Sequence, residues 1–331
     1  MNGDKKSKII KIVIISAIAI AVLAAILVVI GILDSKIGLF PEQEQEDKIL
    51  EHNGQEYVLK DGVETFLVMG LDKISGDVTA DSYNNNQQAD FLMLMVFDNN
   101  TKTYSTIHIN RDTMAEVEVL GVEGNKVGLI DTQIALAHTY GKGGSISNLN
   151  TAKSVSKLLY DVKVNHYMSL TLDSITIMND LVDGVTLEVL NDFTGVEGAE
   201  NLIKGETVTL TPEEALIYVQ GRHGVESSTN IERMERQQQY LNAMRAEMEQ
   251  RVKTDNEFLA NAIIKMADHM ESDCSTARLQ EIGERMKTYE FVEIEEIEGE
   301  TKVNSENMIE FYPYETALKE LVIELFYVPK K

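Results

Sequence analysis

Cysteine is nearly absent from this sequence of 331 residues, in which Cys274 is the only one. A single cysteine cannot form a disulfide within the chain, so its folded part must be held together by its core alone. The lack of an intrachain disulfide fits a protein of the Gram-positive envelope better than one from an oxidising secretory pathway. Internal repeats are also lacking, and the length suits one domain of ordinary or large size plus accessory pieces.

Positive charge is scarce as well. The chain has 30 lysines and arginines against 54 acidic residues, which gives a net charge of -24. Nucleic-acid binding needs a basic face, so we expect no nucleic-acid partner and no adhesion to anionic lipid headgroups. Any anionic ligand must therefore be bound by a few placed cations rather than by the overall field.

Charge is missing altogether from residues 12–33, which are almost entirely Ile, Val, Leu and Ala. As a helix this run would span about 33 Å, enough for a hydrocarbon core of about 30 Å. Lysines precede it and acidic residues follow, so the positive-inside rule predicts a cytoplasmic tail (1–8), a transmembrane anchor (9–33) and an extracellular remainder. A cleaved signal peptide is the alternative. We favour the uncleaved anchor of a single-pass protein of the cell membrane, because the run exceeds a usual signal sequence and no small-x-small cleavage site follows.

Proline is rare, with Pro41 the only one before Pro212. Pro41 lies in a polar, acidic stretch that we interpret as a linker over residues 34–61. Beyond it, apolar runs predict strands, and a Gly, Asp, Ser and Asn-rich stretch at 73–89 predicts a loop. The predicted strands are 66–69, 91–97, 104–109, 166–170, 185–190 and 291–297.

Helical spacing alternates with these strands, which predicts a layered α/β/α sandwich with a central mixed sheet, preceded by the transmembrane helix. Two capping boxes, Thr211-Pro212-Glu213-Glu214 and Thr229-Asn230-Ile231-Glu232, mark helix starts. Other predicted helices are 132–140, 148–160, 172–183, 256–288 and 316–326. We place the extracellular domain at 62–331, with a core (62–247), a helical extension (248–288) and a closing strand and helix (289–328).

Arginine is the most informative scarcity. Arg111 is the only arginine in the first 221 residues, which contain fifteen lysines. Arginine differs from lysine in its planar, permanently charged fork of donors, which binds a phosphate or carboxylate through two bonds. Arg111 follows the predicted strand 104–109, and ligands bind at the carboxyl ends of strands in open α/β sheets. The alternative is a local ion pair between Arg111 and Asp112 that fixes a turn.

Several short motifs follow one another behind the predicted amino-terminal anchor. They are Gly70-Leu71-Asp72, Ala89-Asp90, Arg111-Asp112-Thr113, Asp183-Gly184-Val185, Tyr218-Val219-Gln220-Gly221-Arg222 and Arg233-Met234-Glu235-Arg236-Gln237-Gln238. Each motif alone is weak, but in this order they are specific. Their order resembles the LytR-CpsA-Psr family of envelope enzymes. The match covers about residues 62–247, and the last strand and helix extend it.

The resemblance implies transfer of a glycopolymer, such as a teichoic acid or capsular polysaccharide, from a polyprenyl-pyrophosphate carrier to a peptidoglycan hydroxyl through a phosphodiester. That chemistry needs cations on the pyrophosphate and a divalent metal as Lewis acid. The implied catalytic residues are Arg111, Asp112 and Asp90, and the implied Mg²⁺ ligands are Asp72 and Asp90. The implied pyrophosphate-binding residues are Arg111, Arg222, Arg233, Arg236, Gln88, Gln220 and Gln237.

Three assignments stay open from the sequence. Asp112 either orients Arg111 or accepts the proton of the acceptor hydroxyl. Arg233, Arg236 and Gln237 fall on one face of a predicted helix, which is either a phosphate-binding face or a solvated one with Glu232 paired to Arg236. For Asp72 and Asp90, ordinary turn chemistry is the alternative.

The chain departs from the family pattern in four places. Ile74 stands where an arginine is usual, Gln88 and Gln220 each replace an arginine, and Asn230 replaces an acid. Three cations and one anion are therefore missing from the expected site. These losses favour a second hypothesis, a non-catalytic, membrane-anchored binder or regulator that holds lipid-linked precursors. A purely structural envelope protein ranks below both, because it would leave the matching arginines without a role.

Overall fold

The computed structural model describes residues 49–72, 87–121, 123–221, 230–255, 257–306 and 308–330. The chain divides into two compact units, residues 1–50 and 51–331, and nearly all described residues belong to the second. The predicted anchor at 9–33 and most of the predicted linker lie outside the described ranges. Within those ranges, no helix is both long and apolar enough to cross a membrane.

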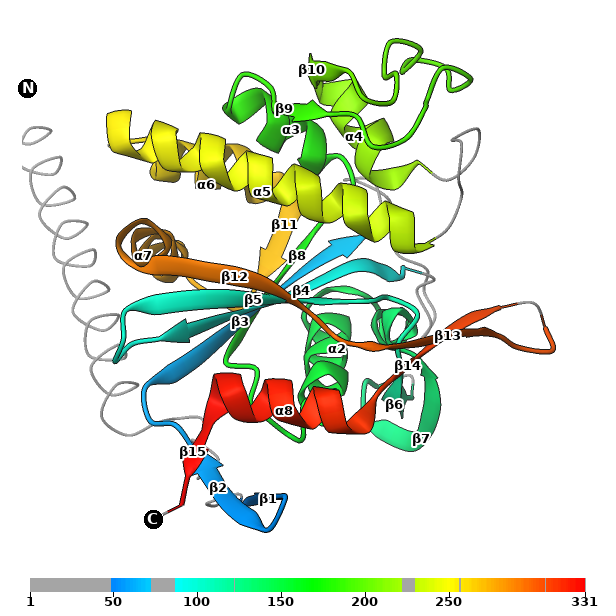
Figure 1. Cartoon of the computed structure of the whole chain (residues 1–331), viewed down its shortest axis with the longest axis vertical. Coiled ribbons are helices and arrows are strands. Elements are labelled where there is room, and N and C mark those ends of the chain that lie inside the picture. The colour runs from blue at the N-terminus through cyan, green and yellow to red at the C-terminus, as the bar shows by residue number, and fades with distance from the viewer. Residues whose placement is uncertain are drawn as a thin grey trace, which may run out of the picture. The chain divides into compact units, whose positions relative to one another are not determined.

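A six-stranded mixed sheet forms the centre of the second unit (Figure 1). Strands β3, β4 and β5 pair antiparallel in chain order, whereas β8 joins β3 and β12 joins β5 in parallel. The order is β11 (Met270–Ser272), β8 (His166–Leu170), β3 (Val63–Leu71), β4 (Ala89–Asp98), β5 (Thr103–Ile109) and β12 (Glu290–Glu296).

The apolar strands β3, β4 and β5 are buried on both faces, because helices cover the sheet from both sides. Phe66 and Phe97 point to one face, where Ile282 packs against them. Leu67 and Met69 have no exposed surface and alternate with Phe66 along β3, so they point to the opposite face. Figure 1 shows α2 (Gly144–Leu158) and α8 (Glu315–Phe326) on one side of the sheet, with α5 (Asn230–Thr254) and α6 (Phe258–Met266) on the other.

A second apolar cluster lies between α5 and a small α/β segment. Its buried residues include Val185, Phe193 and Tyr218. Gly184 turns the chain into this segment with φ at 95°, and an added Cβ would lie 2.8 Å from a methyl of Thr209. The segment comprises α3 (Ser174–Leu181), β9 (Thr186–Glu188), β10 (Thr207–Thr209) and α4 (Pro212–Gln220). The Asp-Gly-Val motif is thus explained by a turn that only glycine fits.

Three predictions about secondary structure were wrong in part, because strand pairing takes up some of each segment. Residues 50–59, predicted as linker, contain β1 (Leu50–His52) and β2 (Gln55–Leu59), and β2 pairs with β15 (Tyr327–Pro329). The predicted helix at 132–140 is confirmed as a 3-10 helix, η1 (Ile134–Thr139), but its first two residues belong to β7 (Lys126–Gln133). The predicted helix at 256–288 is interrupted by the short helix η2 (Ala267–His269) and β11 before α7 (Thr276–Thr288).

Two hairpins flank the sheet edge at which β5 ends, and the sequence predicted neither. The first pairs β6 (Met114–Leu120) with β7, and the second pairs β13 (Gly299–Val303) with β14 (Ile309–Pro313). The other predicted strands and helices are confirmed to within a few residues. The capping box at Thr211 is confirmed in both of its hydrogen bonds, whereas Thr229 of the second box lies outside the described residues.

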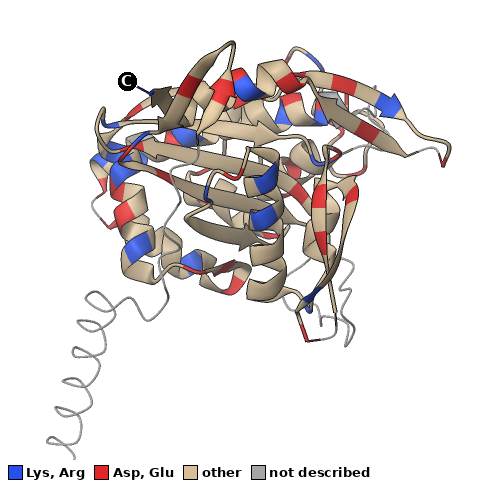
Figure 2. Ribbon diagram, turned by 90° about the horizontal axis from the view of Figure 1, so that it is seen from below, with Lys and Arg blue, Asp and Glu red and all other residues tan. Residues whose placement is uncertain are grey.

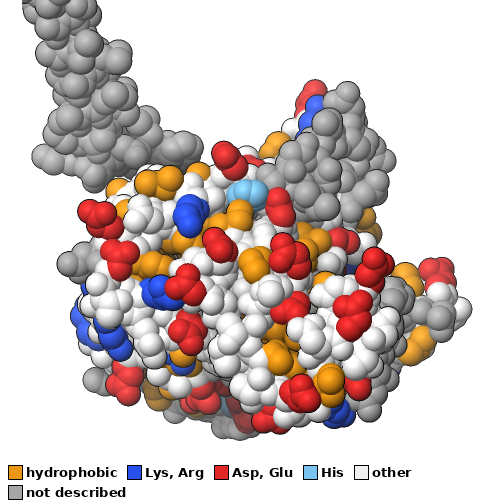
Figure 3. Space-filling model, turned by 90° about the horizontal axis from the view of Figure 1, so that it is seen from above, with side chains coloured by type: hydrophobic (Ala, Val, Ile, Leu, Met, Phe, Trp, Pro, Cys, Tyr) orange, Lys and Arg blue, Asp and Glu red, His pale blue; other side chains and the backbone are white. Residues whose placement is uncertain are grey.

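Charge is dispersed over the described elements. Figure 2 shows lysines and arginines scattered among acidic residues rather than gathered on one element. Figure 3 shows more acidic than basic side chains on the face seen from the top of Figure 1. Long-range attraction therefore does not bring an anion to that face, and an anionic ligand depends on locally placed guanidinium groups.

Candidate active site

The predicted site residues meet at one edge of the sheet because neighbouring strands run in opposite directions. Ile109, the last residue of β5, lies opposite Leu92 near the start of β4, and Leu71 at the end of β3 lies opposite Ala89. The loop after β5 therefore faces the beginning of β4. Arg111 donates from Nη1 to the carboxylate of Asp90 and from Nη2 to Oε1 of Gln88.

An Asx turn fixes the loop that carries Arg111. Oδ1 of Asn110 accepts a hydrogen bond from the backbone N–H of Asp112 at 2.9 Å. Both the backbone N–H and the hydroxyl of Thr113 donate to the carbonyl of Asn110, at 3.0 and 2.6 Å. These local bonds let a tight turn follow directly on the strand, which holds Arg111 at the edge.

Asp112 is buried and contacts the guanidinium from the other side. Its Oδ1 lies 3.3 Å from Nε of Arg111 and accepts a bond from Nε2 of Gln133 at 3.2 Å. The Arg111 Nε contact is an ion pair without hydrogen-bond geometry. Asp90 and Asp112 thus flank one guanidinium. The local ion pair between Arg111 and Asp112 is present, and it involves the same guanidinium that the ligand-site hypothesis assigns to a phosphate.

Arg233 on α5 is almost completely buried and brings a second cation to Asp90. Its Nη1 lies 3.7 Å from Oδ2 of Asp90, whose other oxygen faces Arg111. His108 on β5 is also buried, and burial, together with the charge of Arg233, lowers its pKa to about 4. The imidazole is therefore neutral beside the guanidinium.

Arg236 makes a different set of contacts from Arg111 and Arg233. It is 1 % exposed and donates to the carbonyls of Tyr218 and Gly221 and to Oδ1 of Asn191. Its guanidinium lies 5.4 Å from the ring centre of Phe193. In this structure Arg236 therefore joins α5 to the end of α4.

Gln237 and Gln220 lie at the same junction. Nε2 of Gln237 donates to the carbonyl of Val219 at 3.2 Å, and Gln220 is exposed as the last residue of α4. Arg222, two residues further on, lies outside the described residues. The structure thus brings together Gln88, Asp90, Arg111, Asp112 and Arg233, and it places Gln220, Arg236 and Gln237 in a neighbouring group.

Asp72 and Asp90 offer the oxygen ligands that Mg²⁺ prefers. Asp72 is exposed just after β3, and its backbone N–H donates to the carbonyl of Gln88 at 3.1 Å, two residues before Asp90. Both oxygens of Asp90 already face guanidinium groups. The two carboxylates fit Mg²⁺ if an anionic ligand replaces Asp90 in part of its contacts with Arg111 and Arg233. Mg²⁺ usually binds in this way, through one or two carboxylates together with phosphates.

Neither Gln133 nor the contribution of β14 was predicted from the sequence. Nε2 of Gln133 also donates to the carbonyl of Ile309 at 2.6 Å, and the N–H of Phe311 donates to the carbonyl of Asp112 at 2.8 Å. The loop with Arg111 is therefore hydrogen-bonded to both hairpins. No local pattern marks these partners, since each depends on a pairing between distant segments.

Comparison with known proteins identifies the family of the chain. The family model LytR_cpsA_psr matches residues 39–325. A curated relative in Halalkalibacterium halodurans, the polyisoprenyl-teichoic acid–peptidoglycan teichoic acid transferase TagU, is 25% identical over 157 residues, 47% of this chain and 46% of that protein. TagU of Bacillus licheniformis is 28% identical over 156 residues, 47% of this chain and 43% of its own. The chain thus spans less than half the length of these curated relatives.

Solved structures show the same fold. TagT bound to LIIa-WTA superimposes with a TM-score of 0.58 at 20% identity, covering 80% of this chain and 90% of that one. Protein gbs0355 of Streptococcus agalactiae gives a TM-score of 0.63 at 15% identity, covering 79% and 87%. The mixed α/β fold and the family model together define the class of protein. This chain belongs to the LytR_cpsA_psr family.

Proposed function

We propose that the chain is a transferase that moves a glycopolymer, of the teichoic acid or capsular polysaccharide kind, from a polyprenyl-pyrophosphate carrier to a peptidoglycan hydroxyl. The observation that carries the proposal is the group of Arg111, Asp90 and Arg233, in which one partly buried and one buried guanidinium flank one carboxylate at a sheet edge. The family membership and the names of the TagU relatives support it.

The reaction exchanges the phosphoanhydride bond of the pyrophosphate for a phosphate ester bond to the acceptor. The acceptor oxygen forms a bond to the phosphorus next to the polymer, and the bridging P–O bond breaks. Polyprenyl phosphate leaves with the bonding electron pair, and the hydroxyl proton passes to solvent. In such phosphoryl transfers the protein contributes mainly positioning and charge stabilisation.

Arg111 has the geometry for that contribution. Its Nη1 and Nη2 point toward Asp90 and Gln88, so a pyrophosphate oxygen reaches the same two nitrogens by displacing these partners. Asp112 holds Nε from behind and is itself held by Gln133. A buried carboxylate bound in this way is suited to orient Arg111, and we assign it that role rather than proton transfer.

Mg²⁺ is part of the proposal, with Asp72 and Asp90 as its protein ligands. When bound, the ion would supply Lewis-acid stabilisation of charge on the phosphate oxygens. Asp90→Asn keeps the shape of the side chain but removes the negative charge shared with Arg111 and Arg233. We expect this variant to lose transfer and the Mg²⁺ dependence of donor binding, with an unfolding temperature close to that of wild type.

The assay uses the full chain in detergent, a synthetic polyprenyl-pyrophosphate donor, a glycan acceptor and Mg²⁺. The matched control is Asp183→Asn, which alters an exposed aspartate paired with Arg251. Transfer by wild type and control but not by Asp90→Asn supports the assignment. Transfer by Asp90→Asn at the wild-type rate would show that the metal assignment is wrong.

The replacement of arginines by Gln88 and Gln220 keeps the binder or regulator as a second candidate. In the structure the amide oxygen of Gln88 accepts a hydrogen bond from Arg111. Gln88 therefore uses one donor of Arg111, whereas the arginine usual at this position would add a second cation. A protein that binds donor with Mg²⁺ tightly yet forms no product with any acceptor would favour this second function.

We also propose that the chain is anchored in the cell membrane by residues 9–33, with the folded unit outside. The lysines before the uncharged run and the acids after it support this orientation. Protease treatment of intact cells should remove the folded unit. Recovery of a full-length protected chain would contradict the proposed orientation.

A further inference from the structure

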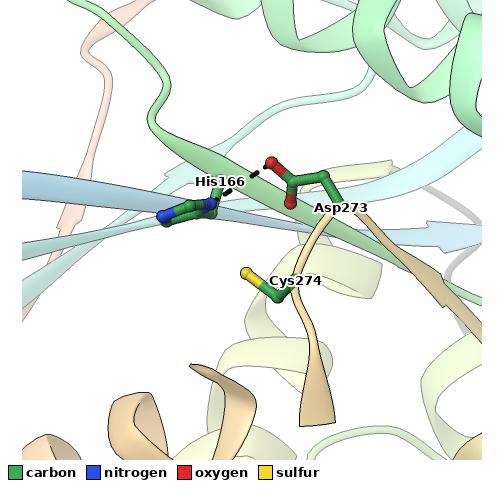
Figure 4. A group of neighbouring side chains, drawn as sticks. All are labelled: His166, Asp273 and Cys274. Carbon is green, nitrogen blue, oxygen red and sulfur yellow. Dashed lines mark hydrogen bonds and ion pairs between the residues drawn. The ribbon is translucent and has the colours of Figure 1, made fainter. Parts of the chain in front are cut away.

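A second group of chemically active side chains lies away from the candidate active site. His166 is the first residue of β8, and Asp273 and Cys274 lie in the turn between β11 and α7. One ligand atom from each of the three lies within 4.8 Å of the others. Figure 4 shows the imidazole, the carboxylate and the thiol around a common space. Among the described residues, these form the only group of three or more such donors.

The turn that carries Asp273 and Cys274 is fixed by hydrogen bonds. Oδ1 of Asp273 accepts from the backbone N–H of Tyr167 at 2.9 Å, so Oδ2 is directed at Nδ1 of His166, 3.2 Å away. The hydroxyl of Ser272 accepts from the N–H of Cys274 at 3.1 Å and donates to the carbonyl of Tyr167 at 2.6 Å. The donors are thus positioned by backbone contacts between β8 and the turn.

The other ring nitrogen of His166 faces a carboxylate. Nε2 lies 3.6 Å from Oε1 of Glu64 on β3, and Glu64 is held by ion pairs with Arg278 and Arg285. A histidine that binds a metal usually directs its second nitrogen to a carboxylate, which fixes the tautomer and raises the basicity of the ligating nitrogen. Glu64 provides that partner, independently of the three donors.

We propose that His166, Asp273 and Cys274 form a binding site for Zn²⁺, with Nδ1, Oδ2 and Sγ as ligands and water in the fourth position. Imidazole, carboxylate and thiolate are the ligand types of zinc, at about 2.0–2.3 Å in tetrahedral geometry. Tetrahedral bonds of this length place the ligand atoms about 3.5 Å apart, so donors within 4.8 Å of one another need to close by up to about 1.3 Å. Asp273 is exposed, which leaves room for this adjustment and for the entry of the ion.

Binding would displace the proton of the thiol to solvent. Burial, and secondarily the charge of Asp273, raises the pKa of Cys274 to about 11, so the thiol is neutral before a metal binds. Zn²⁺ would then join β8 to the turn before α7 and protect the only cysteine of the chain from oxidation. This is a stabilising link of the kind that disulfides supply in other exported domains.

The proposed zinc site is separate from the transfer chemistry. Glu64 lies near the start of β3 and Asp72 follows its end, which places them about 25 Å apart along the strand. The two proposals therefore stand or fall independently, and Cys274→Ser is expected to leave the rate of transfer unchanged.

The test is a metal titration of the full chain in detergent after treatment with a chelator. We expect Zn²⁺ to bind by calorimetry, and Co²⁺ as a replacement to give the charge-transfer absorption of a cobalt–thiolate bond. Cys274→Ser should weaken Zn²⁺ binding at least about tenfold and abolish that absorption. Added Zn²⁺ should raise the unfolding temperature of wild type but not of Cys274→Ser.

The matched control is His269→Gln, which alters a second histidine–aspartate pair, with Asp173 at 3.1 Å, where no cysteine completes a group of donors. Its Zn²⁺ binding should equal that of wild type. Failure of wild type to bind Zn²⁺, or binding that is equally tight in Cys274→Ser, would overturn the proposal. So would a Co²⁺ spectrum without the thiolate band.

Discussion

Arg111, in the loop after β5, binds the carboxylate of Asp90 at the start of β4 and thereby joins two strands at the edge of the central sheet. Around this pair lie Gln88, Asp112 and Arg233. The guanidinium is thus oriented by these partners, and in the proposed reaction a phosphate takes the place of Asp90 and Gln88 at its two terminal nitrogens.

Gln133 is expected to act as a positioning residue through Asp112. Gln133→Met removes the bonds from Nε2 to Asp112 and to the carbonyl of Ile309. A loss of about 1 kcal/mol in the orientation of Arg111 corresponds to a fall in the transfer rate of roughly 5-fold. Gln133→Glu should fall further, because it sets a second carboxylate against Asp112.

The measurement is the transfer rate at saturating donor, with the unfolding temperature recorded in parallel. If Gln133 had only a structural role, both variants would show similarly lowered unfolding temperatures, and Gln133→Glu would not transfer more slowly than Gln133→Met. Equal rates for wild type, Gln133→Met and Gln133→Glu would contradict the positioning role.

His108 predicts a specific dependence of stability on pH. Its pKa in the folded state is about 4, below the ordinary value of 6.5, so the unfolded chain binds more protons between these values. Stability contributed by the neutral imidazole is complete above pH 6.5 and is lost as pH falls toward 4. Between pH 7 and 5 the loss is about 2 kcal/mol.

His108→Leu should remove this pH-dependent part of the stability, since leucine cannot bind a proton at that position. Unfolding by denaturant at pH 7 and pH 5 measures it, and the difference between the two pH values should be smaller in the variant by about 2 kcal/mol. The same pH dependence in both proteins would show that the imidazole is not held neutral in the fold.

The strands that carry the site could be predicted from the sequence because each is a continuous apolar run ending in turn residues. Phe91–Phe97 and Tyr104–Ile109 are buried on both faces, which gives a strong signal within a few residues. The convergence of Asp90 and Arg111 also followed from strand order. The hairpins were missed because β6, β7 and β14 are partly exposed and therefore lack a continuous apolar run.

The role of individual side chains was less predictable. Arg111, Arg233 and Arg236 have the same chemistry in the sequence, yet Arg236 is used to bind backbone carbonyls at the end of α4. Only the packing of α5 against Phe193 and Tyr218 distinguishes it. Spacing on a helix identifies a shared face but not what that face contacts.

Gln220→Arg tests whether the departures from the family pattern weaken the enzyme. Gln220 is exposed at the end of α4, so an arginine there adds a cation without displacing a partner of Arg111. We expect tighter donor binding or faster transfer, by roughly 5-fold to 30-fold for 1 to 2 kcal/mol. Gln88→Arg should gain less, because it removes an acceptor from Arg111 and adds a like charge beside it.

Steady-state kinetics of the two variants check this ranking. The salt dependence of donor binding is a second readout, because salt screens an added contact between arginine and phosphate. Gln88→Arg outperforming Gln220→Arg would contradict the assigned role of Gln88 as a partner of Arg111.

The most direct test of the central claim is the transfer rate of Arg111→Lys compared with Arg251→Lys. Arg111→Lys keeps the charge but loses the two guanidinium nitrogens that face Asp90 and Gln88. Arg251→Lys is the control, because Arg251 forms an exposed ion pair with Asp183. Losing one such contact to the transition state costs roughly 100-fold to 1000-fold in rate. The account predicts that loss for Arg111→Lys, at nearly unchanged unfolding temperature, and wild-type transfer for Arg251→Lys. Equal transfer by wild type and both variants would contradict it.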